Sequence, residues 1–227
     1  MSATIQPRKR KAPPQRREEI VAAASALALR EGLQSLTLRR VAEALGVVPG
    51  LVNHYFPAVD DLAAAAFAHA ASAERNALFA AAPPSTSPLH HMRALLRALT
   101  AVQGDAISLL WLDAWQATRT RPALRAEVTH QMAAWRSDLS RLIACGVASG
   151  CFRTPDPPTT ATRILALLDG LSIQAAIRFT IGYATVRDLV VETIARELGL
   201  EATLLRQAAV GEGNNGTRPD IPSATPP

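Results

Sequence analysis

Cysteine is scarce in this chain, with two residues among 227, and several other features of specialised proteins are missing. Cys145 and Cys151 fit free packing residues better than a disulfide, because thiols stay reduced in the cytosol. No apolar run reaches the roughly 18–20 residues of a membrane span, and no signal-peptide core follows the first residues. We therefore expect a cytoplasmic protein that has no membrane partner.

Residue sets for catalysis or metal binding are also missing. The sequence has no Ser/His/Asp or Cys/His set, no metal-ligand spacing and no glycine-rich phosphate loop. His90 and His91 are adjacent, but no Cys, Asp or Glu lies at ligand spacing from them. The sequence therefore predicts neither an enzyme nor a bound metal or cofactor.

Alternation of β-branched residues is absent, and alanine and leucine dominate between proline and glycine clusters. With 48% hydrophobic residues the chain can bury a sizeable core. We predict an all-α fold of about nine helices. They span approximately residues 16–31, 38–45, 49–56, 60–81, 88–102, 105–118, 122–146, 157–180 and 185 onward, the last opened by a capping box at Thr185–Asp188.

The segment TLRRVAEALGVVPGLVNHYF, residues 37–56, has the pattern of two short helices around a glycine. Apolar residues of the first helix follow the spacing i, i+3, i+4, i+7, which places them on one face. Thr37 can cap this helix, and Gly46 can end it in a left-handed conformation. Pro49 suits the first turn of the second helix. The pattern is typical of a helix-turn-helix that enters the major groove of DNA.

The distribution of charge along the chain also indicates DNA binding. The formal net charge is +5, and the nine basic and four acidic residues of positions 1–56 account for all of it. The remaining residues sum to zero, with 15 of each sign. A basic head on a neutral body indicates that one end of the protein meets a phosphate backbone.

The sequence GVVPGLVNHYF followed by DDL, after TLRRVAEALG, resembles the TetR family of bacterial transcriptional repressors. The resemblance is close from Arg17 to Leu62, and residues 110–152 and 161–178 resemble the C-terminal domain of the BetI-like branch. It implies a three-helix DNA-binding domain joined to a helical ligand-binding and dimerisation domain. It also implies a homodimer that binds a palindromic operator and is released by an unidentified small-molecule effector. The expected boundaries are a disordered basic arm at 1–14, a DNA-binding domain at 15–60, a body at 61–208 and a disordered tail at 209–227.

The same resemblance assigns residues to DNA. Val52 and Phe56 should face inward, which leaves the rest of the second helix for the groove. Thr37 and Tyr55 would contact phosphate. The expected DNA-binding residues are Arg17, Thr37, Arg40, Pro49, Gly50, Leu51, Asn53, His54 and Tyr55. Val48 stands where the family usually has a serine cap, and residues 57–59 lack the usual lysine; the basic arm would compensate for both losses.

In the body, Trp111 and Trp115 are one helical turn apart and share a face. They could form an aromatic cage for a quaternary ammonium ligand, or they could simply pack between helices. The expected pocket residues are Trp111, Trp115, Gln131, Trp135, Asp169 and Gln174. The expected dimer contacts are Leu168, Leu171, Arg178, Leu189 and Thr193.

A DNA-binding dimer with no effector pocket remains the alternative. It predicts a filled interior, whereas an effector site requires a cavity of a few hundred Å³ between the fourth and eighth helices. In the favoured interpretation one long helix joins the DNA-binding head to the body.

Overall fold

The computed structural model describes residues 12–81, 87–99, 105–177 and 183–206, and these residues form helices and no strand. The prediction of an all-α fold is therefore confirmed. The helices in chain order are α1 (Pro13–Glu31), the 3-10 helix η1 (Leu33–Ser35), α2 (Leu38–Leu45), α3 (Pro49–Tyr55), α4 (Val59–Phe79), α5 (Pro88–Leu99), α6 (Asp105–Ala117), α7 (Pro122–Ala148), α8 (Pro157–Ala176), α9 (Tyr183–Glu197) and α10 (Ala202–Arg206).

Several helix ends differ from the prediction. Helix α1 begins at Pro13 instead of residue 16, because proline suits the first helical turn. Helix α8 ends at Ala176 instead of about residue 180. Helix α9 begins at Tyr183, so the prediction that a capping box at Thr185 opens this helix is wrong. The short helix α10 was not predicted. It packs on α9 and α5.

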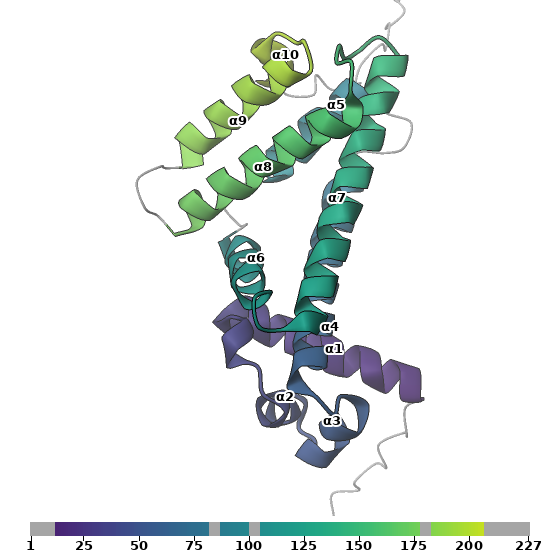
Figure 1. Ribbon diagram of the computed structural model, residues 1–227, viewed down its shortest axis with the longest axis vertical. Coiled ribbons are helices and arrows are strands. Elements are labelled where there is room, and N and C mark those ends of the chain that lie inside the picture. Colours follow the sequence, from purple (N-terminus) through teal and green to yellow (C-terminus); the bar gives the residue numbers. More distant parts are fainter. Residues whose placement is uncertain (1–11, 82–86, 100–104, 178–182, 207–227) are drawn as a thin grey trace, which may run out of the picture.

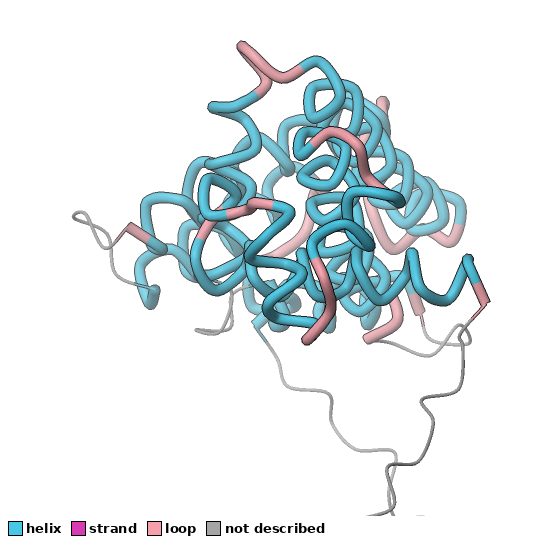
Figure 2. Tube along the Cα trace, turned by 90° about the horizontal axis from the view of Figure 1, so that it is seen from below, coloured by secondary structure: helices cyan, strands magenta, loops and turns pink. Residues whose placement is uncertain are grey.

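The helices form an elongated molecule (Figure 1). Helices α1, α2 and α3 lie together at one end. The long helices α4 and α7 run from there toward the opposite end, where α5, α8, α9 and α10 lie. The view from below shows helices connected by short loops throughout the described part of the chain (Figure 2). This arrangement separates the basic end from the body.

The head and the body share one hydrophobic core. Ile20, Val41 and Val52 belong to the same buried cluster as Leu110 and Leu124, which come from α6 and α7. A second cluster fills the opposite end, between α5, α7, α8 and α9. Helix α4 joins the head to the body, as expected of one long connecting helix, and the packing of α1 on α6 adds a second contact between them.

Polar contacts add to this junction. The carboxylate of Asp113 on α6 accepts a hydrogen bond from the backbone N–H of Leu33, at 3.0 Å. Arg121, which precedes α7, pairs with Asp60 of α4 at 3.5 Å. Leu33 follows α1 and Asp60 follows α3, so a movement of α6 or α7 would displace residues next to the helices of the head.

Candidate functional site

The first helix of the predicted motif forms as its caps dictate. The hydroxyl oxygen of Thr37 accepts from the backbone N–H of Arg40 at 3.1 Å. Gly46 ends α2 with φ 64° and ψ 40°, the left-handed conformation that glycine adopts at low cost. Val41 and Ala42 are fully buried. These predictions are confirmed. The turn at Gly46 sets the direction in which the chain continues into α3.

Helix α3 presents the predicted outer surface. Val52 and Phe56 are 0% and 2% exposed, so the inward face is the one that the spacing predicts. The outward-facing residues are Pro49, Gly50, Asn53 and His54, which are exposed, and Leu51, which is half-buried. The amide of Asn53 and the imidazole of His54 can therefore hydrogen-bond to base edges, and the side chain of Leu51 can contact thymine methyl groups.

Tyr55 differs from its neighbours on α3. Its ring is half-buried and packs against the core of the head. The exposed ring of His54 meets it edge-on, with ring centroids 5.3 Å apart. Packing therefore fixes the ring of Tyr55 and restricts that of His54.

The two predicted arginines are held by the head itself. The guanidinium of Arg17 lies over the ring of Phe56, 4.8 Å from its centroid. Arg40 donates to the carbonyl of Ser35 at 3.0 Å and to the carboxylate of Glu31. Hydrogen bonds from Arg40 and Arg30 lower the pKa of the Glu31 carboxyl. Arg40 thus stabilises the turn before α2, and only its remaining N–H groups are free to meet phosphate.

Val48 is the most exposed large apolar side chain of the described residues, at 71%. It precedes α3 and makes no side-chain cap, so the first N–H groups of the helix have no side-chain acceptor there. Of the basic arm at residues 1–14 that was expected to compensate, residues 1–11 lie outside the described residues, and Pro13 and Pro14 belong to α1.

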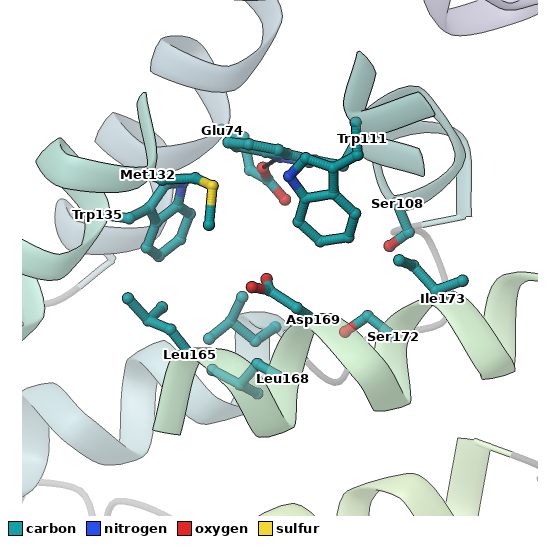
Figure 3. Close-up of a pocket in the computed structure, with 12 residues that line it drawn as sticks. Glu74, Ser108, Trp111, Met132, Trp135, Leu165, Leu168, Asp169, Ser172 and Ile173 are labelled. Atoms are coloured by element: carbon teal, nitrogen blue, oxygen red, sulfur yellow. Dashed lines mark hydrogen bonds between the residues drawn. The ribbon is translucent and has the colours of Figure 1, made fainter. Parts of the chain in front are cut away.

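A cavity in the body lies between α4, α5, α6, α7 and α8 (Figure 3). Its volume is about 90 Å³. The lining residues are Glu74, Leu99, Ser108, Trp111, Trp115, Met132, Trp135, Leu165, Leu168, Asp169, Ser172 and Ile173.

All three tryptophans of the chain line this cavity. Trp111 meets Phe67 edge-on at 4.8 Å and lies 5.8 Å from Trp115, measured between ring centroids. Trp135 lies 5.6 Å from Phe79. The tryptophans therefore do both things that the sequence left open: they pack against the core, and they form an aromatic wall around the cavity.

Two carboxylates point into the same cavity, that of Glu74 from α4 and that of Asp169 from α8 (Figure 3). The indole N–H of Trp111 donates to Glu74 Oε2 at 3.4 Å. Burial raises the pKa of Glu74 to about 7, opposed by the bond from Trp111 and assisted by the negative charge of Asp169. Burial alone raises the pKa of Asp169 to about 6. The described lining residues include no Lys, Arg or His.

Four predicted pocket residues line the cavity: Trp111, Trp115, Trp135 and Asp169. Gln131 does not, because its buried amide is bound between α4 and α7 by Ser72, Arg75 and Glu127. Gln174 does not line it either. Its side chain is exposed, although Ser172 and Ile173, which precede it on α8, face the cavity. Both assignments to the pocket are wrong.

Glu74 is the main lining residue that the sequence prediction missed. It could have been found, because Phe67, Ala70 and Ala71 are buried at spacings of three and four on α4, and Glu74 continues that face. Met132, Ser108 and the aliphatic lining residues of α8 carry no comparable signal, because helix spacing alone does not tell a cavity from a core.

The predicted dimer contacts separate into two groups. Leu168 and Leu171 are only 7% and 8% exposed, and both belong to the core of the protomer. Their burial within the protomer leaves little of either side chain for a partner to contact, and Leu168 faces the cavity. Leu189 on α9 is 41% exposed and Thr193 is half-buried. Arg178 lies outside the described residues.

The described residues hold no group of His, Cys, Asp and Glu that could bind a metal ion. Both cysteines are free. Among the helices described, none is long and apolar enough to cross a membrane.

Comparison with protein-family models gives two matches. Residues 20–66 match the model of bacterial regulatory proteins of the TetR family. Residues 88–199 match that of the BetI-type transcriptional repressor C-terminal domain. The matches cover the head and most of the body.

Curated relatives include the HTH-type transcriptional regulator BetI of Paraburkholderia phymatum, 28% identical over 173 residues, which are 71% of this chain and 82% of the relative. The BetI of Rhizobium meliloti is 25% identical over 165 residues, 73% of this chain and 80% of the relative. None of these similarities is to an enzyme.

Two crystal structures share the fold. A TetR transcription regulator from Haloarcula marismortui has a TM-score of 0.68 and 20% identity, over 82% of this chain and 97% of the other. A Saccharomonospora viridis protein in complex with choline has a TM-score of 0.70 and 21% identity, over 82% of this chain and 98% of the other.

Proposed function

Because this chain is a DNA-binding transcriptional regulator of the TetR family with a BetI-type C-terminal domain, we propose that it is a ligand-controlled repressor. In this proposal a homodimer binds a palindromic operator in the cytoplasm, and a small organic cation releases it. The observation that carries the proposal is the cavity: an aromatic wall of three tryptophans, two carboxylates and no basic lining residue.

The lining favours a positively charged ligand. Indole faces attract cations, and the attraction is strongest where water is excluded. The carboxylates of Glu74 and Asp169 add negative charge on the α4 and α8 sides. An anionic ligand would be repelled by both carboxylates. Choline, bound by the Saccharomonospora viridis protein of the same fold, carries the positive charge that this lining favours.

The DNA side of the proposal rests on the exposed surface of α3. Asn53 and His54 would reach base edges, Leu51 a thymine methyl group, and Gly50 would let the backbone approach the DNA. Thr37, Tyr55, Arg17 and the free N–H groups of Arg40 would contact phosphate. In a dimer the two α3 helices must be about 34–36 Å apart to enter successive major grooves.

For the dimer we propose pairing of α8 and α9 with the same helices of a second protomer. Ile177 and Leu189 are large apolar side chains that remain more than 40% exposed in the single chain. Burial of such side chains against a partner is favourable, and a two-fold axis would present the same surface on both protomers. Thr193 lies one turn from Leu189 and joins this surface.

The cavity is connected to the head through α6. Trp111 and Trp115 line the cavity, and Asp113 between them binds the backbone of Leu33. A ligand that displaces the indoles would therefore shift α6 and the base of the head together. Repression ends, in this proposal, when ligand binding favours a spacing of the two heads that misses the operator.

The small volume of the cavity favours the alternative, a DNA-binding dimer without an effector. Ligand sites commonly measure about 300–1,000 Å³. An operator selected from random DNA with the purified protein distinguishes the two. We expect choline or a related cation to weaken binding of that operator at least tenfold. Equal affinity with and without the best-binding cation would overturn release by an effector and leave the alternative.

A further inference from the structure

Among the described residues that line it, the cavity combines two carboxylates with no cationic side chain. Among the described residues Glu74 accepts only the long hydrogen bond from the Trp111 indole, and Asp169 lies opposite it on α8 (Figure 3). Indoles, aliphatic groups and a methionine make up most of the remaining lining. Two negative charges in such surroundings repel each other and lose most of their hydration.

The charged groups on the surrounding helices are engaged elsewhere. Arg75, next to Glu74 on α4, binds Asp138 at 3.1 Å and Gln131 at 2.9 Å, both on α7. On α8, Arg163 pairs with Glu197 of α9.

The remaining elements offer no counter-charge to the pair either. On α5, Arg93 donates to the carbonyl of Leu204 and Arg97 is exposed. His91, also on α5, binds the carbonyl of Phe79. The ionisable groups on α6, Asp105 and Asp113, are acidic. On α7, Glu127 and His130 bind each other and Arg136 is exposed.

A pair of largely buried acids that has no counter-cation among the described lining residues keeps a proton, as paired carboxyl groups in shared sites do. Burial and the neighbouring charge raise the pKa of Glu74 to about 7, whereas that of Asp169 rises to about 6. Both directions agree with the geometry.

We propose that the empty cavity stores one proton on the Glu74–Asp169 pair and gives it up to solvent when an organic monocation binds. The inference rests on the proposed function, because it concerns the same effector cavity. Charge balances in the exchange. One carboxyl and one carboxylate carry a net charge of about −1 before binding, and two carboxylates with one bound cation carry the same charge afterwards.

This exchange makes effector affinity depend on pH. Protons compete with the cation, so affinity is low where the pair is protonated and rises as the pH passes through the pKa of Glu74. With a pKa of about 7 the affinity should rise about tenfold from pH 6 to pH 8. The regulator would therefore respond to the cation more readily at neutral and alkaline pH than at acid pH.

Calorimetric titration of choline into the full-length protein at pH 6.5 tests the exchange. Two buffers of different ionisation enthalpy separate the heat of binding from the heat of proton uptake by the buffer. We expect about one proton to be released per choline bound. Glu74→Gln should bind choline with almost no proton release. Asp61→Asn, an exposed acid on the same helix, is the matched control and should behave as the wild type.

A second measurement needs no ligand. Because all three tryptophans line the cavity, the tryptophan fluorescence of the full-length protein reports on its surroundings. We expect the emission to titrate with a midpoint near 7, and Asp169→Asn to move that midpoint down, since the neighbouring charge that raises the pKa of Glu74 is removed. This titration also decides the question if Glu74→Gln does not fold.

The outcomes separate the two proposals. Choline binding without proton release, or a wild-type emission that does not change between pH 5 and 8, would overturn the proton exchange and leave the repressor proposal intact. If neither choline nor tetramethylammonium binds between pH 6 and 8.5, the cationic effector is wrong and the exchange falls with it.

Discussion

The carboxylate of Asp113 binds the backbone N–H of Leu33 at 3.0 Å, across 80 residues of sequence. The neighbouring Gly32 permits this approach, because a Cβ atom at that position would lie 2.8 Å from Asp113 Oδ2. Gly32 also has φ 84°, a conformation that favours glycine. The contact joins the helix that carries two cavity tryptophans to the turn that follows α1.

Asp113→Ala should weaken the response of DNA binding to choline several-fold. Choline affinity itself should change less than about twofold, because Asp113 does not line the cavity. Loss of the bond should also lower the free energy of unfolding by about 1 kcal/mol. Operator binding with and without choline is the measurement. Asp113→Asn, which retains an acceptor oxygen, is the control; an undiminished response in Asp113→Ala would show that the signal takes another path.

Glu74→Gln should stabilise the protein at pH 8 and have little effect at pH 5. The pKa of Glu74 is raised from 4.5 to about 7 in the folded protein, so the folded state holds the proton more tightly than the unfolded state. Stability therefore falls as the pH rises from about 4.5 to about 7, by on the order of 3 kcal/mol at most. Thermal melts at both pH values test this, with Asp61→Asn for comparison. A pH-independent difference would contradict it.

Val48→Ser should strengthen the start of α3. A serine oxygen at this position can accept from the first N–H groups of the helix, which stabilises proteins by about 1 kcal/mol. The hydroxyl can also donate to phosphate, so operator affinity should rise. Val48→Ala is the control, because it removes the exposed methyl groups without adding a cap. Equal melting temperatures for the serine and alanine variants would show that the cap does not form.

Substitutions on α3 should separate phosphate contacts from base contacts. Tyr55→Phe should lower affinity by a similar factor on every DNA sequence, because phosphate contacts carry no sequence information. His54→Ala or Asn53→Ala should change which bases are preferred. Selection of binding sites from random DNA by each variant measures this. A new base preference in Tyr55→Phe would reverse the assigned roles.

Removal of residues 1–11 should weaken operator binding and flatten its dependence on salt. The segment contains Arg8, Lys9, Arg10 and Lys11. Each phosphate contact contributes a slope of about −0.9 in log affinity against log salt, so the slope should fall by between about 1 and 4. An arm of equal length with serine in place of the four basic residues is the control. An unchanged slope would mean that the arm makes no phosphate contact.

Sequence reasoning succeeded where the structure depends on near neighbours. Thr37 and Gly46 cap α2 as predicted, and Val52 and Phe56 face inward as their spacing requires. Trp111 and Trp115 share a face because one helical turn separates them. Such features follow from helix geometry within a few residues, and no distant contact is needed to specify them.

The errors concern residues whose surroundings come from other helices. Gln131 is polar in an apolar helix, which is equally consistent with a pocket and with the interhelical network in which it lies. Leu168 and Leu171 are as apolar as interface residues, yet both are buried in a core cluster of the protomer itself. Spacing identifies the buried face of a helix but not the element that covers it.

The sequence alone determined the all-α class, the helix-turn-helix and the family, because capping residues, apolar spacing and a basic head act locally or sum over composition. Only the tertiary structure decided that Glu74 faces Asp169 across an aromatic cavity and that Asp113 reaches Leu33. These pairs lie on different helices, and the packing of α4, α6 and α8 brings them together. Their chemistry, raised pKa values and a link from cavity to head, exists only once that packing has excluded water.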